Sequence, residues 1–100
     1  MVKLTDDTFT SYIQTNESVV VKFGADWCMP CVRMKPVFQA LDSKYNVQFA
    51  EVDIDLSKQI VSQNHIVSVP TIVVYKNGEE VNRITGAKSQ KAIEEELYFD

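Results

Sequence analysis

The stretch 19-VVVKFGADWCMPC-31 decides the fold, because a continuous apolar run leads within it to a CxxC pair. The run over 19–24 is interrupted only by Lys22, which is typical of a central strand covered on both faces. From Cys31 onward, apolar side chains recur at helical spacing, which predicts one long helix that carries the pair at its start. Pro36 should kink this helix.

Cys28 and Cys31 are the only cysteines of the chain. Residues three apart in a helix lie on one face, about 5 to 6 Å apart, so these thiols can form a disulfide without unwinding the turn. With Cys28 at the first helical position, unpaired N–H groups and the helix dipole favour its thiolate at an exposed helix tip. We therefore expect Cys28 to be the nucleophile and Cys31 the resolving thiol. Pro30 suits the first turn, where its missing N–H has no partner to lose.

Three other uses of the cysteine pair compete with redox exchange. The thiols could be buried structural residues, although this spacing at a strand-to-helix junction is more typical of a redox motif. A structural zinc site needs four ligands, and the chain adds only a lone His65 and no further cysteine. A permanent disulfide across so short a loop would stabilise the fold little. Reversible exchange is therefore favoured, and no metal is expected.

The composition indicates one domain over residues 1–100, with a hydrophobic content of 45%. The net charge of −4 is spread along the chain, which argues against nucleic-acid binding. The first residues contain no apolar stretch of signal-peptide length, and no later run approaches the roughly 18 residues of a membrane span. We therefore expect a cytoplasmic protein without membrane contact. In a reducing compartment, a CxxC pair points to catalysis or metal binding.

The remaining signals alternate between helices and strands. One helix is predicted from an N-cap at Thr5, with Asp6 in its first turn, and Ser57 and Ser89 are expected to cap two more. Further strands are predicted over 47–54, 71–75 and 81–84, the last two joined by a tight turn. This order predicts an α/β fold in which a central mixed sheet of about five strands, with a C-terminal antiparallel hairpin, is flanked by four helices. In such sheets the reactive site lies beyond the carboxyl end of a central strand, where Cys28 falls.

Four motifs of the chain resemble the thioredoxin family. They are Trp27-Cys28-x-Pro30-Cys31, Val69-Pro70-Thr71, Asn77-Gly78 and Gly86, in this order over essentially the whole chain. The resemblance implies the thioredoxin fold and a thiol–disulfide oxidoreductase that reduces protein disulfides and maintains cell redox homeostasis. It also implies a monomer whose partners are disulfide-containing clients and a flavin-containing thioredoxin reductase that draws electrons from NADPH. The chain has no dinucleotide-binding glycine motif, so we expect it to bind no cofactor itself.

The resemblance also implies a substrate-binding surface around the cysteines. The family proline that matches Pro70 is cis and lies beside the disulfide, and an X-Pro bond adopts this form at modest cost. The backbone of the preceding Val69 would pair with an extended client segment. Together with these residues, Trp27, Ile54 and Gly86 would form the flat apolar surface on which clients dock.

Two positions near the cysteines depart from the family pattern. Met29 stands where thioredoxins usually have glycine, and its flexible, polarizable side chain should, with Pro30, tune the reduction potential and the fit of clients. Gly24 stands where the family commonly has a large aromatic residue, so we expect a more open wall of the site.

The charges beside the site are exchanged relative to the family. Thioredoxins generally bury an aspartate six residues before the nucleophile and pair it with a lysine on the next strand, whereas these positions are Lys22 and Glu51 here. An isolated charge in a central strand costs on the order of several kcal/mol, so Lys22 needs a partner. We hypothesise that Glu51 accepts the Cys31 proton through water while Lys22 holds the carboxylate. The alternative is that both side chains extend to solvent without a catalytic role.

Two rival functions compete with protein-disulfide reduction. A disulfide oxidase or isomerase would use the same chemistry with a different stability of the reduced form, since Met-Pro is not the common reductase pair. A binding module would use the thioredoxin-like surface to hold a partner protein, with incidental thiols. The absence of an export signal in the sequence argues against the oxidase.

Overall fold

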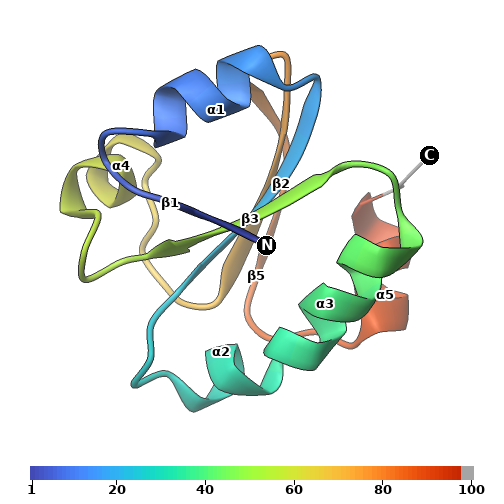
Figure 1. Ribbon diagram of the computed structural model, residues 1–100. Helices are drawn as coiled ribbons and strands as arrows, with labels where there is room; N and C mark the ends of the chain where they lie inside the picture. Colours follow the sequence, from blue (N-terminus) through green and yellow to red (C-terminus); the bar gives the residue numbers. More distant parts are fainter. Residues whose placement is uncertain (98–100) are drawn as a thin grey trace.

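The computed structural model describes residues 1–97 and builds them around a five-stranded sheet (Figure 1). The elements along the chain are β1 (Val2–Leu4), α1 (Phe9–Thr15), β2 (Ser18–Gly24), α2 (Met29–Arg33), α3 (Lys35–Lys44), β3 (Gln48–Asp53), α4 (Lys58–Gln63), β4 (Thr71–Lys76), β5 (Glu79–Thr85) and α5 (Gln90–Leu97). Across the sheet the order is β1-β3-β2-β4-β5. β1 and β2 run parallel to β3, whereas β4 is antiparallel to β2 and β5. The predicted mixed sheet with its C-terminal hairpin is confirmed.

β2 is the central strand because both of its faces are covered. All of its residues after Ser18 are buried. Val19, Val21 and Phe23 face α1 and α4, whereas Val20 faces α3 and α5 on the opposite side of the sheet (Figure 1). This burial on two faces explains the continuous apolar run, and it leaves the carboxyl end of the strand as the place where reactive groups can emerge.

A two-residue turn joins β4 to β5. Asn77 and Gly78 have φ angles of 52° and 84°, and a type I′ turn requires positive φ at both central residues. Asparagine and glycine adopt this backbone more readily than other residues do. The turn chemistry therefore sets the hairpin that the sequence predicts.

The helix that follows the cysteines is interrupted, not merely kinked. α2 and α3 meet at Met34, whose N–H is shared by the carbonyls of Pro30 and Cys31 at 3.2 and 3.1 Å. Pro36 has no N–H with which to continue the hydrogen-bond series onto Val32. Counted as one interrupted helix, α2 and α3 match the predicted long helix. No helix within residues 1–97 is long and apolar enough to cross a membrane.

The beginning of the chain differs from the prediction. Val2–Leu4 form the edge strand β1, which is too short for an alternation pattern to reveal. α1 begins at Phe9, because the carbonyl of Thr5 accepts the N–H groups of Thr8 and Phe9 in a turn before the helix. The N-cap expected at Thr5 is therefore wrong, and Asp6 does not lie in the first turn of α1.

Asp6 instead caps a helix that is distant in the sequence. Its carboxylate accepts the N–H of Ile60 in the first turn of α4 at 2.9 Å. Ser57 is the N-cap residue of α4, but its side chain makes no capping bond, so the prediction for this hydroxyl is wrong. Ser89 does cap α5, since its Oγ accepts the N–H of Ala92 at 3.2 Å. A tertiary contact thus replaces a local cap at α4.

Candidate active site

The CxxC pair lies just beyond the carboxyl end of β2, at the start of α2. The loop over 25–27 joins strand and helix, and the Cys28 N–H donates to the carbonyl of Ala25 at 3.2 Å. Cys28 and Cys31 form a disulfide, with their Cα atoms 5.2 Å apart. Their separation by one helical turn therefore brings the two sulfurs together, as expected from the spacing.

Cys28 is the N-cap residue of α2, one position before the first helical residue. Its Sγ accepts the N–H of Cys31 at 3.2 Å, and Pro30 lies in the first turn. An amide that points at the sulfur, together with the positive end of the helix, favours a thiolate over a thiol. The electrostatic reason for a reactive Cys28 therefore holds at the N-cap position as well.

Neither sulfur lies at an exposed helix tip in the disulfide form, so the expected exposure of Cys28 is wrong. Cys28 is 5% exposed and Cys31 is 3% exposed. Ala25, Ile54 and Val69 pack against the pair. Ile54 follows β3 and Val69 precedes β4, so the cover comes from segments that are distant from the cysteines in the sequence.

An apolar surface surrounds the disulfide. Trp27 is 65% exposed, and its Nε1–H donates to the carboxylate of Asp55 at 2.8 Å. Met29 is also exposed, whereas Ile54 and Val69 are half-buried against the cysteines. The structure therefore packs Ile54 and Val69 on the reactive pair, while Trp27 and Met29, the sequence neighbours of Cys28, are exposed.

Pro70 follows Val69 through a cis peptide bond, as the resemblance implies. The carbonyl of Pro70 accepts the N–H of Gly86 at 2.8 Å, which ties the segment after β5 to this loop. Gly86 has a φ of 87°, a conformation that favours glycine. Gly86 is thus joined to the cis-proline loop by the backbone.

The loop that carries Val69 is anchored by Arg83 of β5, which the sequence patterns did not single out. The Arg83 guanidinium donates to the carbonyls of Asn64 and His65 at 2.7 and 3.1 Å. It also donates to both carboxylate oxygens of Glu80 at 2.7 and 2.9 Å, and these bonds raise the pKa of Arg83. Arg83 and Asn64 are separated by 19 residues, so no local motif reveals their contact.

Lys22 and Glu51 are neighbours across β2 and β3, with 3.9 Å between the Lys22 Nζ and a carboxylate oxygen. The Lys22 side chain is 5% exposed and the Glu51 side chain 27%. Burial lowers the pKa of Lys22, the Glu51 carboxylate opposes this shift, and Lys35 adds to it. The Lys22 amine also lies 5.5 Å from the centre of the Phe38 ring. The structure thus brings the two charges together, with the lysine as the buried partner.

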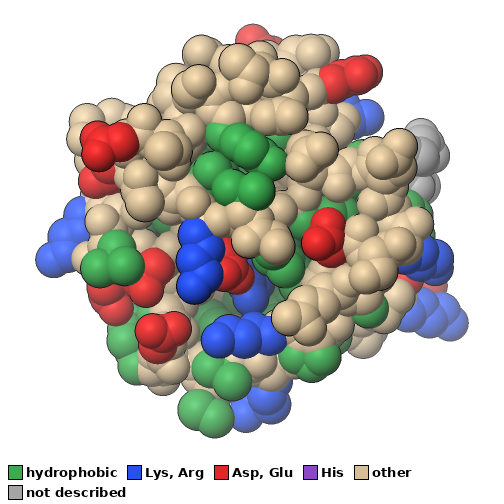
Figure 2. Space-filling view, viewed as in Figure 1, with side chains coloured by type: hydrophobic (Ala, Val, Ile, Leu, Met, Phe, Trp, Pro, Cys, Tyr) green, Lys and Arg blue, Asp and Glu red, His purple; other side chains and the backbone are tan. Residues whose placement is uncertain are grey.

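A recess of about 340 Å³ lies between this ion pair and the disulfide, and its walls include Lys22, Gly24, Cys31 and Glu51. A Cβ added at Gly24 would lie 3.3 Å from both Cβ and Sγ of Cys31. The glycine therefore lets β2 and the start of α2 approach closely. On the face that carries β1, basic and acidic side chains lie next to one another (Figure 2).

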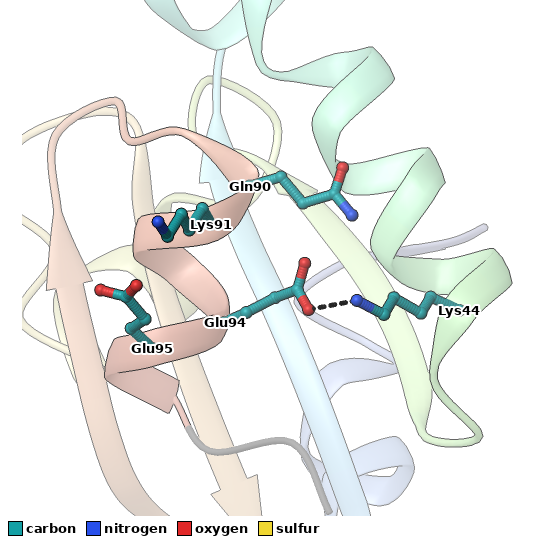
Figure 3. A pocket seen from close by; sticks show the side chains of 5 residues that line it. All are labelled: Lys44, Gln90, Lys91, Glu94 and Glu95. Atoms are coloured by element: carbon teal, nitrogen blue, oxygen red, sulfur yellow. Dashed lines mark hydrogen bonds and ion pairs between the residues drawn. The ribbon is translucent and has the colours of Figure 1, made fainter.

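A second and more open cavity, of about 530 Å³, lies between α3 and α5 (Figure 3). Its lining residues are Lys44, Gln90, Lys91, Glu94 and Glu95. Glu94 forms an ion pair with Lys44 at 2.6 Å and also accepts a hydrogen bond from the Tyr45 hydroxyl, and these hydrogen bonds lower the pKa of Glu94. Because Lys44 ends α3 and Glu94 lies in α5, we assign this ion pair to holding the two helices together.

The thioredoxin family model matches residues 1–98. The chain belongs to the thioredoxin family. Thioredoxin of Mycobacterium bovis is 35% identical over 99 residues, which cover 96% of this chain and 85% of the relative. The bifunctional thioredoxin reductase/thioredoxin of Mycobacterium leprae is 32% identical over 99 residues, which cover 96% of this chain and 22% of the relative. A solved structure of Plasmodium falciparum thioredoxin has a TM-score of 0.90 at 35% identity and covers 95% of this chain and 94% of its own.

Membership of the thioredoxin family, with a cysteine pair joined in a disulfide, makes the protein a thiol–disulfide oxidoreductase. Its mixed sheet and helices form the thioredoxin fold. Thioredoxins bind no cofactor of their own. In the part of the chain that the structure describes, residues 1–97, no His, Cys, Asp and Glu side chains are grouped to bind a metal ion.

Proposed function

We propose that this member of the thioredoxin family is a cytoplasmic, monomeric, single-domain reductant of protein disulfides, with Cys28 as the nucleophile and Cys31 as the resolving thiol. The hydrogen bond from the Cys31 N–H to the Cys28 sulfur carries this proposal, because an amide that points at a sulfur stabilises its thiolate. Cys31 lies one turn further along the helix, within reach of the same sulfur.

The proposed reaction is a pair of thiol–disulfide exchanges. The Cys28 thiolate attacks one sulfur of a client disulfide, forms a mixed disulfide and releases the other client sulfur as a thiolate. Cys31 then loses its proton and attacks the Cys28 sulfur. The remaining client sulfur leaves as a second thiolate, and the Cys28–Cys31 disulfide closes. The electron pair of the dithiol has passed to the client, so no bound cofactor takes part in the exchange.

The apolar surface around the disulfide is the proposed docking site for clients. Trp27 offers a large exposed ring, and Ile54 and Val69 lie against the cysteines. The backbone of Val69 and the cis Pro70 would align an extended client segment, and the hydrogen bond from the Gly86 N–H to the Pro70 carbonyl holds this loop. In addition, Met29 and Pro30 directly follow Cys28 in the sequence and are proposed to tune the reduction potential and the fit of clients.

Glu51 and Lys22 form the proposed proton-transfer pair. Their ion pair and Cys31 line the same recess, which is large enough for several water molecules at about 30 Å³ each. Through such water, the Glu51 carboxylate would accept the proton that Cys31 releases, and Lys22 would hold the carboxylate in place. The partial exposure of Glu51 then returns the proton to solvent.

The substitution Glu51→Gln is expected to slow the attack of Cys31 on a Cys28 mixed disulfide by about tenfold near neutral pH. A positioned base usually contributes about 10²-fold or more, and solvent access to the recess reduces this contribution. The deficit should shrink as the pH rises, because hydroxide then removes the proton directly. Release of thionitrobenzoate from a preformed Cys28 adduct measures the step. Asp26→Asn, at an exposed carboxylate of the same recess, is the matched control, and an unchanged rate and pH profile for Glu51→Gln would remove Glu51 from the mechanism.

Electrons are proposed to reach the protein from NADPH through a thioredoxin reductase. The relative from Mycobacterium leprae supports this partner, because a thioredoxin reductase and a thioredoxin are named together in one bifunctional protein. With NADPH and a thioredoxin reductase, the protein should carry out electron transport to insulin, a client whose reduction makes it precipitate. Dithiothreitol in place of the reductase tests the exchange chemistry separately.

The same assays separate the reductase from its rivals. Ready oxidation of glutathione by the disulfide form, without insulin reduction, would identify a disulfide oxidase or isomerase. A protein that reduces neither insulin nor glutathione disulfide but still retains a partner after both cysteines are replaced with serine would be a binding module. The first result would overturn the proposed direction of electron flow, and the second would overturn the proposed redox function.

A further inference from the structure

The recess beside Cys31 is lined by charged side chains from three strands, from α3 and from the loop before α2. The cations are Lys3 from β1, Lys22 from β2 and Lys35 from α3, and the acids are Asp26 from the loop before α2 and Glu51 and Asp53 from β3. Lys22 is 4% exposed, whereas the other five side chains are half-buried or exposed. Because water and salt screen exposed charges most, the Lys22 ammonium should act most strongly on Cys31.

The geometry of β2 places Lys22 on the face of the strand against which Cys31 packs. Lys22 and Gly24 lie two residues apart and therefore on the same face of β2. Cys31 packs on Gly24 so closely that an added Cβ would lie 3.3 Å from its Sγ, and Gly24 has no side chain to separate the sulfur from the lysine. Glu51 belongs to β3, about 4.8 Å further across the sheet. The positive member of the pair is thus on the strand that Cys31 contacts.

The Lys22 ammonium is also held in place without being neutralised. Its Nζ lies 5.5 Å from the centre of the Phe38 ring and 3.9 Å from the Glu51 carboxylate, which is too long for a hydrogen bond. The Glu51 carboxylate opposes the effect of burial on the pKa of Lys22 and helps the amine to stay charged. The Lys22 side chain is therefore fixed at the recess, beside a carboxylate that favours its charged form.

We propose that the Lys22 ammonium stabilises the Cys31 thiolate and thereby shifts the Cys28–Cys31 couple toward its reduced form. The inference rests on the proposed function only in taking these cysteines as the cycling pair. Reduction of the disulfide adds an electron pair, breaks the S–S bond and normally adds a proton to each sulfur. Because the ammonium raises the thiolate fraction of Cys31, fewer protons are taken up on average. A couple whose reduced form is stabilised in this way is a stronger oxidant than one without the buried cation.

The equilibrium between the disulfide and the dithiol in a glutathione redox buffer tests this inference. Lys22→Met removes the charge and keeps an unbranched side chain. At a pH where the Cys31 thiol is ionised, this variant is expected to shift the equilibrium about tenfold toward the disulfide, the effect of about one pKa unit at a thiol. Lys22→Arg keeps the charge and should stay within about twofold of the parent protein. Lys3→Met is the matched control, because Lys3 is an exposed cation of β1 in register with Glu51 of β3. Its equilibrium constant should also stay within about twofold of the parent value.

A second variant has the opposite expected sign. At a pH low enough to keep Lys22 charged in both proteins, Glu51→Gln removes only the carboxylate and should shift the equilibrium toward the dithiol. A merely structural disturbance would not change sign between the two partners. The pH dependence of the equilibrium constant should also be steeper for Lys22→Met than for the parent protein, because reduction of the variant takes up more protons. Circular dichroism verifies that each variant is folded. An unchanged equilibrium for folded Lys22→Met would overturn the inference, whereas a parent protein that does not exchange with glutathione at all would overturn the proposed function instead.

Discussion

Replacing Cys31 with serine is expected to leave the protein covalently joined to its clients. The amide that stabilises the Cys28 sulfur is the backbone N–H of residue 31. A serine at this position keeps that N–H, so the first attack should proceed. A serine hydroxyl does not displace a thiolate from a disulfide, so the mixed disulfide persists. Turnover should fall by at least about 10³-fold, because an intramolecular attack by a positioned thiol is replaced by attack from dilute thiols in solution.

Mass spectrometry and non-reducing electrophoresis of Cys31→Ser with an oxidised client measure the trapped adduct. Cys28→Ser is the control, and it should form no adduct and show no turnover, because the sulfur at the start of α2 is missing. The two cysteines are similarly buried in the disulfide form, at 5% and 3% exposed, so we assign the first attack to Cys28 from the helix amide and not from exposure. Trapping by Cys28→Ser and not by Cys31→Ser would reverse the assigned roles.

Phe38→Ala is expected to lower the free energy of unfolding by about 3–5 kcal/mol, the usual cost of emptying a buried aromatic site. Phe38 is fully buried at the centre of the core between the sheet and α3, and its ring meets that of Phe49 edge to face at 5.2 Å. A domain of this size is stable by only about 5–15 kcal/mol, so the loss is a large share of the total. The melting temperature should fall by roughly 12 °C or more.

Urea denaturation of the oxidised protein measures this change. Phe38→Leu keeps most of the apolar volume and should cost about 1.5 kcal/mol, and Val67→Ala, at a side chain that is 92% exposed, should change stability by less than about 0.5 kcal/mol. A loss for Phe38→Ala no larger than that for Phe38→Leu would mean that the surrounding side chains refill the site. The ring would then not be required for a close-packed core.

The parts of the fold that the sequence predicts correctly have local causes. The central strand is a continuous apolar run because both of its faces are covered, and the hairpin turns at Asn77 and Gly78 because these residues accept positive φ. The place of the cysteine pair at a strand-to-helix junction is also predicted correctly, because the apolar strand pattern, the two cysteines and the start of the helix all lie within one short stretch of sequence. The thioredoxin resemblance then supplied the cis bond at Pro70, which no pattern in the chain predicts by itself.

The parts that the sequence does not predict depend on contacts between distant segments. Asp6 was expected to begin the first helix, but packing places its carboxylate at the Ile60 amide, 54 residues away, and leaves the Ser57 hydroxyl without its expected role. Lys3 lies in register with Glu51 only because β1 pairs with β3, and so short a strand gives no signal of its own. The cover over Cys28 likewise comes from separate loops, which is why its low exposure was not expected.

The Arg83 guanidinium connects the edge strand β5 to the loop that carries Val69, because it donates hydrogen bonds to the carbonyls of Asn64 and His65. β5 is the last strand of the sheet, and much of its outer surface is exposed. Substitutions in β5 therefore act, through the hydrogen bonds of Arg83, on the loop that carries Val69, the residue proposed to align clients. We therefore expect substitutions in β5 to be able to change client preference while the two sulfurs and the charges beside them stay the same.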